Sequence, residues 1–161
     1  MRGPWRPVFL IGILLPAVSA PCAEPALVPV TVCEILQDLP MYEGKPVALV
    51  GRYSFRQDGR WLGQEACEDN SGAPATIWLT EDVRDAPKPP ADFELDGIML
   101  ARKLADIRKH TALGKFRFGT PDYDRWAVVY GRIETSKGDI AKKAHAELVF
   151  RGDGVIIFLA Q

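Results

Sequence analysis

The chain has 161 residues, of which 47% are hydrophobic, and this is enough for one ordinary domain with a core. Its 20 basic and 21 acidic residues are mixed along the chain and give a net charge of -1. This balance provides neither the basic surface that is typical of nucleic-acid binding nor an acidic tail, so it argues against a polyanionic partner.

Residues 1–23 have the pattern of a secretory signal peptide. Arg2 and Arg6 precede a short apolar stretch, VFLIGILL, and small residues follow in PAVSAPCA. A membrane-spanning helix needs about 20 apolar residues, so a permanent anchor is the weaker interpretation. We expect an exported protein, periplasmic or secreted in a Gram-negative bacterium, whose mature chain starts between Pro21 and Glu24. Loss of the two arginines would change the net charge from -1 to -3.

The three cysteines fit an oxidising compartment. Cys22 leaves a lipoprotein open as the second choice, although Pro21 departs from the small residue that a lipobox has there. Cys33 and Cys67 then form the expected structural disulfide. A redox-active pair would show a Cys-x-x-Cys spacing, which is absent. Neither cysteine has histidines at metal-ligand spacing, so we expect no metal and no cofactor.

The first predicted elements are a capped helix and a glycine-interrupted strand. Thr31 and Glu34 have the spacing of a capping box before the helical pattern VCEILQDL, which Pro40 should end. Residues 47–55 alternate as a strand that Gly51 interrupts. A glycine inside a strand commonly marks a bend or a bulge. We therefore expect a sharply coiled strand of a small barrel.

Two further strands are predicted before a long connection. After a turn at residues 57–59, RWLGQEAC should return antiparallel and carry Cys67. Residues 68–74 form a loop by composition. In the third strand, ATIWLTED, alternation places Ile77 and Leu79 on one face and Trp78 on the other.

The second half of the chain contains a helix and the last strands. Residues 96–110 place Leu100, Leu104 and Ile107 on one helical face, which predicts an amphipathic helix on a core. In the next strand, RWAVVYGRIE, Gly131 again interrupts an apolar run. The final stretches, AELVFRG and GVIIFLA, fit either a hairpin or one long bulged strand.

This order of elements, β-β-β-α-β-β with a coiled first strand, resembles the OB-fold. The segments YEGKPVALVGRY and YDRWAVVYGRIE in particular look like small bacterial exported OB-fold-type proteins of uncharacterised function, in which a short cysteine-bearing helix comes first. The resemblance implies a mainly β protein with helices (α+β): a small five-stranded OB-like barrel over residues 24–161, with an insertion at 84–124 between strands three and four. It carries no catalytic residue to this chain.

The same resemblance implies a ligand surface on strands two and three. It would use Arg60, Trp61 and Trp78 with the loop 68–74, and we add Tyr123 ahead of the fourth strand. Tryptophan stacks on a sugar, a base or a peptide ring. The alternative is that one or both tryptophans pack against the insertion.

The spacing of the histidines and acidic residues indicates no catalytic or metal site. His110 and His145 have no acid-base partner that a motif identifies, and we expect both at the surface or at its boundary with the core. Asp122 and Asp124, with the acids at 68 and 69, could bind calcium, but no calcium-loop spacing is present, which favours solvated loop acids. Catalytic motifs of the known kinds are absent.

The preferred hypothesis is an exported, non-enzymatic module that binds a small solute, a glycan or an envelope protein through the barrel face. The alternative is an enzyme whose site is built on residues 84–124. A single-stranded nucleic-acid binder is disfavoured by the acidic balance. Contact with a membrane is expected only through the signal segment or a lipid on Cys22.

Overall fold

The computed structural model describes residues 26–65, 67, 75–90, 93–114, 122–152 and 156–160. The predicted signal peptide, Cys22 and the loop 68–74 lie outside these residues. Within the described part of the chain, no helix has the length and apolar character needed to cross a membrane.

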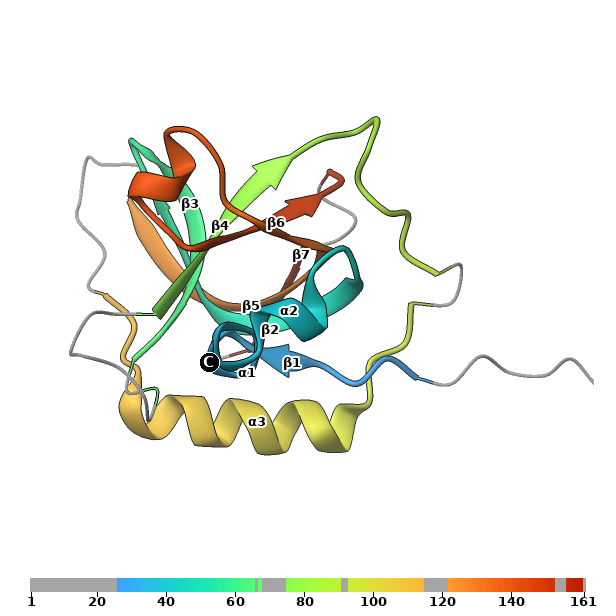
Figure 1. Ribbon diagram of the computed structural model, residues 1–161. Coiled ribbons are helices and arrows are strands. Elements are labelled where there is room, and N and C mark those ends of the chain that lie inside the picture. Colours follow the sequence, from blue (N-terminus) through green and yellow to red (C-terminus); the bar gives the residue numbers. More distant parts are fainter. Residues whose placement is uncertain are drawn as a thin grey trace, which may run out of the picture.

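Five strands close into a barrel (Figure 1): β2 (Pro46–Arg56), β3 (Gly59–Gln64), β4 (Ala75–Glu81), β5 (Tyr123–Thr135) and β6 (Ala146–Phe150). They are hydrogen-bonded in the order β2-β3-β4-β6-β5, and pairing of β2 with β5 closes the barrel. The β4–β6 pair is parallel and the other pairs of the barrel are antiparallel. The protein is therefore mainly β with few helices, and its closed mixed barrel is consistent with the expected small OB-like barrel.

The interior of the barrel follows the predicted alternation of side chains. Val47, Leu49 and Tyr53 of β2 are buried in one core with Ile77 and Leu79 of β4. The helix α1 (Val32–Gln37) contributes two fully buried side chains to the same core and contacts β2, β3 and β4. The core thus unites the barrel with the short helix that precedes it.

Gly51 and Gly131 lie where neighbouring backbone approaches closely. A Cβ at position 51 would lie 3.2 Å from the carbonyl oxygen of Gly63, and one at position 131 would lie 2.5 Å from that of Val149. Residues 46–55 of β2 pair with β5 while residues 52–56 pair with β3, so this strand belongs to two sides of the barrel and must coil. Glycine permits that approach because it has no side chain.

The segment 84–124 supplies a helix that covers the outside of the barrel. α3 (Gly97–His110) begins after Asp96, whose side chain accepts hydrogen bonds from two backbone N–H groups of the first turn. The predicted apolar face, Leu100, Leu104 and Ile107, packs in a second core on the outer face of β2 and β5. Figure 1 shows α3 along one side of the barrel, near α1 and β1 (Val30–Thr31), which pairs in parallel with β2. The amphipathic helix is therefore confirmed.

Two predictions about element ends were wrong. Pro40 does not end a helix: α1 stops at Gln37, and Pro40 lies in the first turn of α2 (Leu39–Tyr42), where a missing N–H costs no helical hydrogen bond. β3 ends at Gln64, so Cys67 follows the strand instead of lying within it.

The hairpin alternative for the C-terminal strands was also wrong. β6 pairs with residues 131–135 of β5, and β7 (Ile156–Phe158) pairs with residues 127–129 of the same strand. Both run antiparallel to β5 and follow one another along it. The arrangement is closer to the other alternative, one long strand that is interrupted between residues 150 and 156. A 3-10 helix, η1 (Ile140–Lys142), lies in the connection from β5 to β6.

Candidate functional site

A pair of stacked indoles lies on the outer face of β3 and β4. Trp61 and Trp78 are direct partners across the two strands, and their ring centroids are 5.6 Å apart with planes at 16°. Both side chains belong to half-buried residues. The Lys143 ammonium lies 4.4 Å from the centroid of the Trp78 ring. We call Trp61, Trp78 and Lys143 the tryptophan patch.

Local backbone geometry positions this patch. The Trp78 ring packs over Gly59, where any side chain would overlap it. Lys143 follows η1 and its Nζ also donates a hydrogen bond of 3.1 Å to the backbone oxygen of Asp58. The two loops at positions 57–58 and 136–145 therefore meet beside the indoles. These contacts of Trp78 all come from outside the segment 84–124, against which the alternative interpretation would have packed it.

Arg60 and Tyr123 belong to a different surface from the tryptophans. The Arg60 guanidinium lies 4.6 Å from the ring centroid of the fully buried Phe150 and forms an ion pair of 2.6 Å with Glu81. Burial lowers the pKa of Arg60, but hydrogen bonds with Glu81 and Tyr53 outweigh it, so the pKa lies above its usual value. Arg60 is thereby held half-buried against Phe150 and Glu81 instead of being directed at the tryptophan patch.

Tyr123 takes part in an aromatic cluster on the same inward side. Its ring stacks on Phe55 at 5.5 Å and on Tyr53 at 6.0 Å between centroids. Phe158 of β7 meets Tyr53 edge to face at 5.6 Å. Four ligand residues were expected from the sequence. Trp61 and Trp78 lie together in the structure, whereas Arg60 and Tyr123 lie on the inward side of the strands, apart from the two indoles.

Asp124 is a buried ion-pair residue, so its prediction as a solvated loop acid was wrong. Its side chain is 3% exposed and accepts hydrogen bonds from Arg56 at 2.6 Å and from the Gly114 N–H at 2.7 Å. Burial raises the pKa of this carboxyl, but hydrogen bonds from Ser54, Gly114 and Arg56 outweigh it and hold the pKa below its usual value. Both oxygens are engaged in fastening the segment after α3 to β2 and β5.

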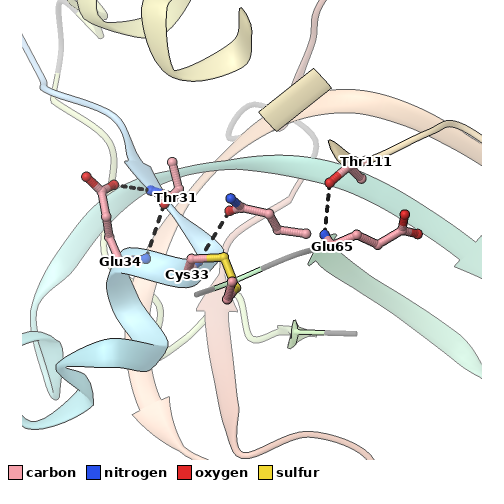
Figure 2. The surroundings of a disulfide bond; sticks show 7 residues. Thr31, Cys33, Glu34, Glu65 and Thr111 are labelled. Atoms are coloured by element: carbon pink, nitrogen blue, oxygen red, sulfur yellow. Dashed lines mark hydrogen bonds between the residues drawn. A yellow bond between two sulfur atoms is a disulfide. The ribbon is translucent and has the colours of Figure 1, made fainter. Parts of the chain in front are cut away.

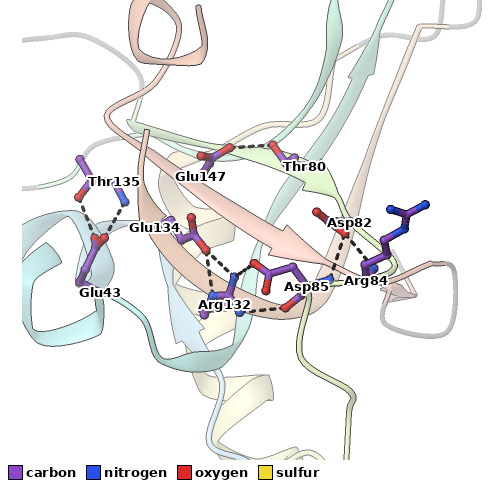
Figure 3. Close-up of polar contacts among 9 residues, drawn as sticks. All are labelled: Glu43, Thr80, Asp82, Arg84, Asp85, Arg132, Glu134, Thr135 and Glu147. Carbon is purple, nitrogen blue, oxygen red and sulfur yellow. Dashed lines mark hydrogen bonds and ion pairs between the residues drawn. The ribbon is translucent and has the colours of Figure 1, made fainter. Parts of the chain in front are cut away.

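Other acids are similarly occupied in structural contacts (Figure 3). Arg132 of β5 pairs with Glu134 and with Asp85 in the turn after β4. Glu43 accepts hydrogen bonds from the side chain and the backbone of Thr135, and these lower its pKa. Among the described residues, no group of three or more His, Cys, Asp or Glu side chains could hold a metal ion. His110 and His145 are both exposed, as predicted.

The disulfide joins α1 to the segment after β3 (Figure 2). Cys33 and Cys67 are bonded with their Cα atoms 5.4 Å apart, and Cys33 is 8% exposed. The capping box at Thr31 and Glu34 lies directly beside it.

Comparison with models of protein families, with curated protein sequences and with solved structures finds no match.

Proposed function

We propose that this protein is an exported, non-enzymatic binding module with an OB-fold, and that its tryptophan patch binds a glycan of the cell envelope. The OB-fold assignment is supported by the strand order β2-β3-β4-β6-β5 with closure by β2–β5, and by the parallel pairing of β4 with β6 among the otherwise antiparallel pairs of this barrel. OB-folds bind oligonucleotides and oligosaccharides on the face of their second and third strands and the loops beside it. In this barrel those strands are β3 and β4, which carry Trp61 and Trp78.

The observation that carries the proposal is the stacked pair of indoles on that face. The two stacked, nearly parallel rings provide an apolar surface that suits the flat face of a sugar ring. The Lys143 ammonium, which lies over the ring of Trp78, adds a hydrogen-bond donor to this patch. A mature net charge of -3 favours a glycan over a nucleic acid.

The competing hypothesis is an enzyme with its site on residues 84–124. Such an enzyme would need acidic side chains or a histidine that point into a common pocket and are not already paired in ion pairs that hold the fold together. Asp85 pairs with Arg132 and Asp124 pairs with Arg56, at the two ends of that segment. These ion pairs attach the segment to the barrel. They favour the binding module.

Pelleting with purified peptidoglycan sacculi tests the proposal. The wild-type chain should co-sediment, and Trp61→Ala should weaken binding by about five- to ten-fold, the loss expected for one aromatic stack. Phe158→Ala is the matched control, because it removes a 47% exposed ring on another surface. Equal binding by wild type and W61A would show that the patch is not the site, and co-sedimentation of none of the three would exclude this glycan.

The export part of the proposal needs its own experiment. The intact mass of protein from the native host should correspond to a chain that starts between residues 21 and 24, with Cys33 and Cys67 protected from alkylation until reduction. A full-length mass with freely alkylated cysteines would contradict export and leave the glycan without a compartment in which to meet this protein.

A further inference from the structure

A cleft of about 990 Å³ lies between α1 and α3, with the disulfide of Cys33 and Cys67 in its wall. This volume is at the upper end of the range of small-molecule sites, about 300 to 1,000 Å³. Gln37 of α1 and Gln64 at the end of β3 bring amide groups to the lining. The cleft shares no lining residue with the tryptophan patch, so a ligand here would be separate from the proposed glycan.

One face of α3 gives the cleft an excess of positive charge. Asp106 follows Arg102 by four residues and Lys103 by three, and Lys109 follows Asp106 by three, so the four side chains line one side of the helix. Lys109 pairs with Asp106 at 3.1 Å, and both side chains are largely exposed. Arg102 is exposed and has no ion-pair partner among the residues that the structure describes. Its guanidinium remains available to an anion.

The walls of the cleft are fixed by contacts that cross between elements. Lys103 donates to both carboxylate oxygens of Glu34 at 2.7 Å, which ties α3 to α1. Burial raises the pKa of Glu34, but hydrogen bonds from Lys103 and from the backbone of Thr31 outweigh it and keep the pKa low. Figure 2 shows the capping box and the hydrogen bond from the Cys33 N–H beside the disulfide. A ligand would thus meet a preorganised wall, which reduces the entropy lost on binding.

We propose that this cleft binds a small molecule that carries carboxylate or phosphate groups, with Arg102 as its principal contact. A guanidinium offers a planar fork of donors that matches either group in a bidentate way. Lys109, beside its ion-pair partner Asp106, places an ammonium donor at the same wall, and Gln37 contributes an amide for uncharged oxygens of the ligand.

Calorimetric titration with citrate and with pyrophosphate, each at constant ionic strength, tests this site in the mature protein. Arg102→Gln should weaken binding by about five-fold, the loss expected for one partly exposed charged contact. Arg84→Gln is the matched control, because Arg84 is also exposed and lies in the turn after β4, outside the cleft lining. Trp61→Ala should bind the anion like the wild type, whatever the outcome with sacculi.

Saturable binding that R102Q weakens and R84Q does not would support the proposal. Binding of citrate alone would assign a carboxylate ligand, and binding of pyrophosphate alone a phosphate ligand. Absence of saturable binding for both probes would overturn the proposal. An equal loss in R102Q and R84Q would overturn it as well, because this would reveal only general attraction to the protein's positive charge.

Discussion

Gly131→Ala should destabilise the barrel, because the added methyl group has no space. Its Cβ would lie 2.5 Å from the carbonyl oxygen of Val149, 2.9 Å from Cγ of Leu148 and 3.1 Å from Cβ of Phe150. The Val149 oxygen belongs to the backbone, and Cβ of Phe150 is fixed directly to it. Neither atom can rotate away, so β5 and β6 must move apart. Overpacking of this kind costs about 1 to 3 kcal/mol. Alanine also reduces the conformational entropy of the unfolded chain, which offsets about 0.4 to 1 kcal/mol of this cost. We therefore expect the free energy of unfolding to fall by about 1 to 2 kcal/mol.

Two other glycines calibrate this prediction. At Gly51 the nearest atoms lie at 3.2 to 3.6 Å and one of them is a Val32 methyl group, so Gly51→Ala should change the free energy of unfolding by less than about 1 kcal/mol. Gly97 has nothing within 4 Å at the start of α3, so Gly97→Ala should stabilise by about 0.5 kcal/mol.

Urea unfolding followed by tryptophan fluorescence measures all three variants, with the 5% exposed Trp126 among the reporters. The order of stability should be G97A, then G51A, then G131A. A G131A variant as stable as the wild type would refute the inference that close strand approach requires glycine at that position.

Three further outcomes follow from the contacts of the described residues. Asp124→Asn should lower stability at pH 7 by about 1 to 3 kcal/mol, because it removes the charge that faces Arg56. The pKa of Asp124 is depressed in the folded state, so its contribution to stability is present above about pH 4 and is lost as the pH falls through the folded pKa. Chemical unfolding across that range should show the stabilities of the wild type and D124N converging as the pH falls. Reduction of the disulfide between Cys33 and Cys67, which are 34 residues apart, should cost about 3 to 4 kcal/mol in guanidinium unfolding, and an unchanged midpoint would contradict its structural role. Thr31→Ala should cost about 1 kcal/mol in the same assay through loss of the helix cap, whereas a cost near zero would mean that the cap is dispensable.

The sequence predicted those elements that bury one face against a core. β4 and α3 each have a regular apolar period, and the residues that the pattern placed inside, such as Ile77 and Ile107, are buried. β1 has only two residues, too few for a period, and it exists because Val30 and Thr31 pair with β2. The separate pairing of β6 and β7 along β5 likewise depends on register between distant segments, which no local pattern encodes.

The candidate site was predicted only in part. Trp61 and Trp78 lie together, but Arg60 could have been excluded from their surface, because successive residues of a strand point to opposite faces. Lys143 reaches Trp78 from a loop, and the cleft arises where Lys103 meets Glu34 across 69 positions of the chain. Such contacts are set by tertiary packing, and single-sequence patterns carry no signal for them.

The most direct test of the proposed function is an NMR titration of the isotopically labelled mature protein with soluble peptidoglycan fragments, observed at the indole N–H signals. The proposal predicts progressive shifts for Trp61 and Trp78, while the signal of the buried Trp126 stays in place. It also predicts that W61A needs a roughly five- to ten-fold higher fragment concentration to reach the same shift of the remaining Trp78 signal. Shifts confined to residues elsewhere, or none at saturating fragment, would contradict glycan binding by the tryptophan patch.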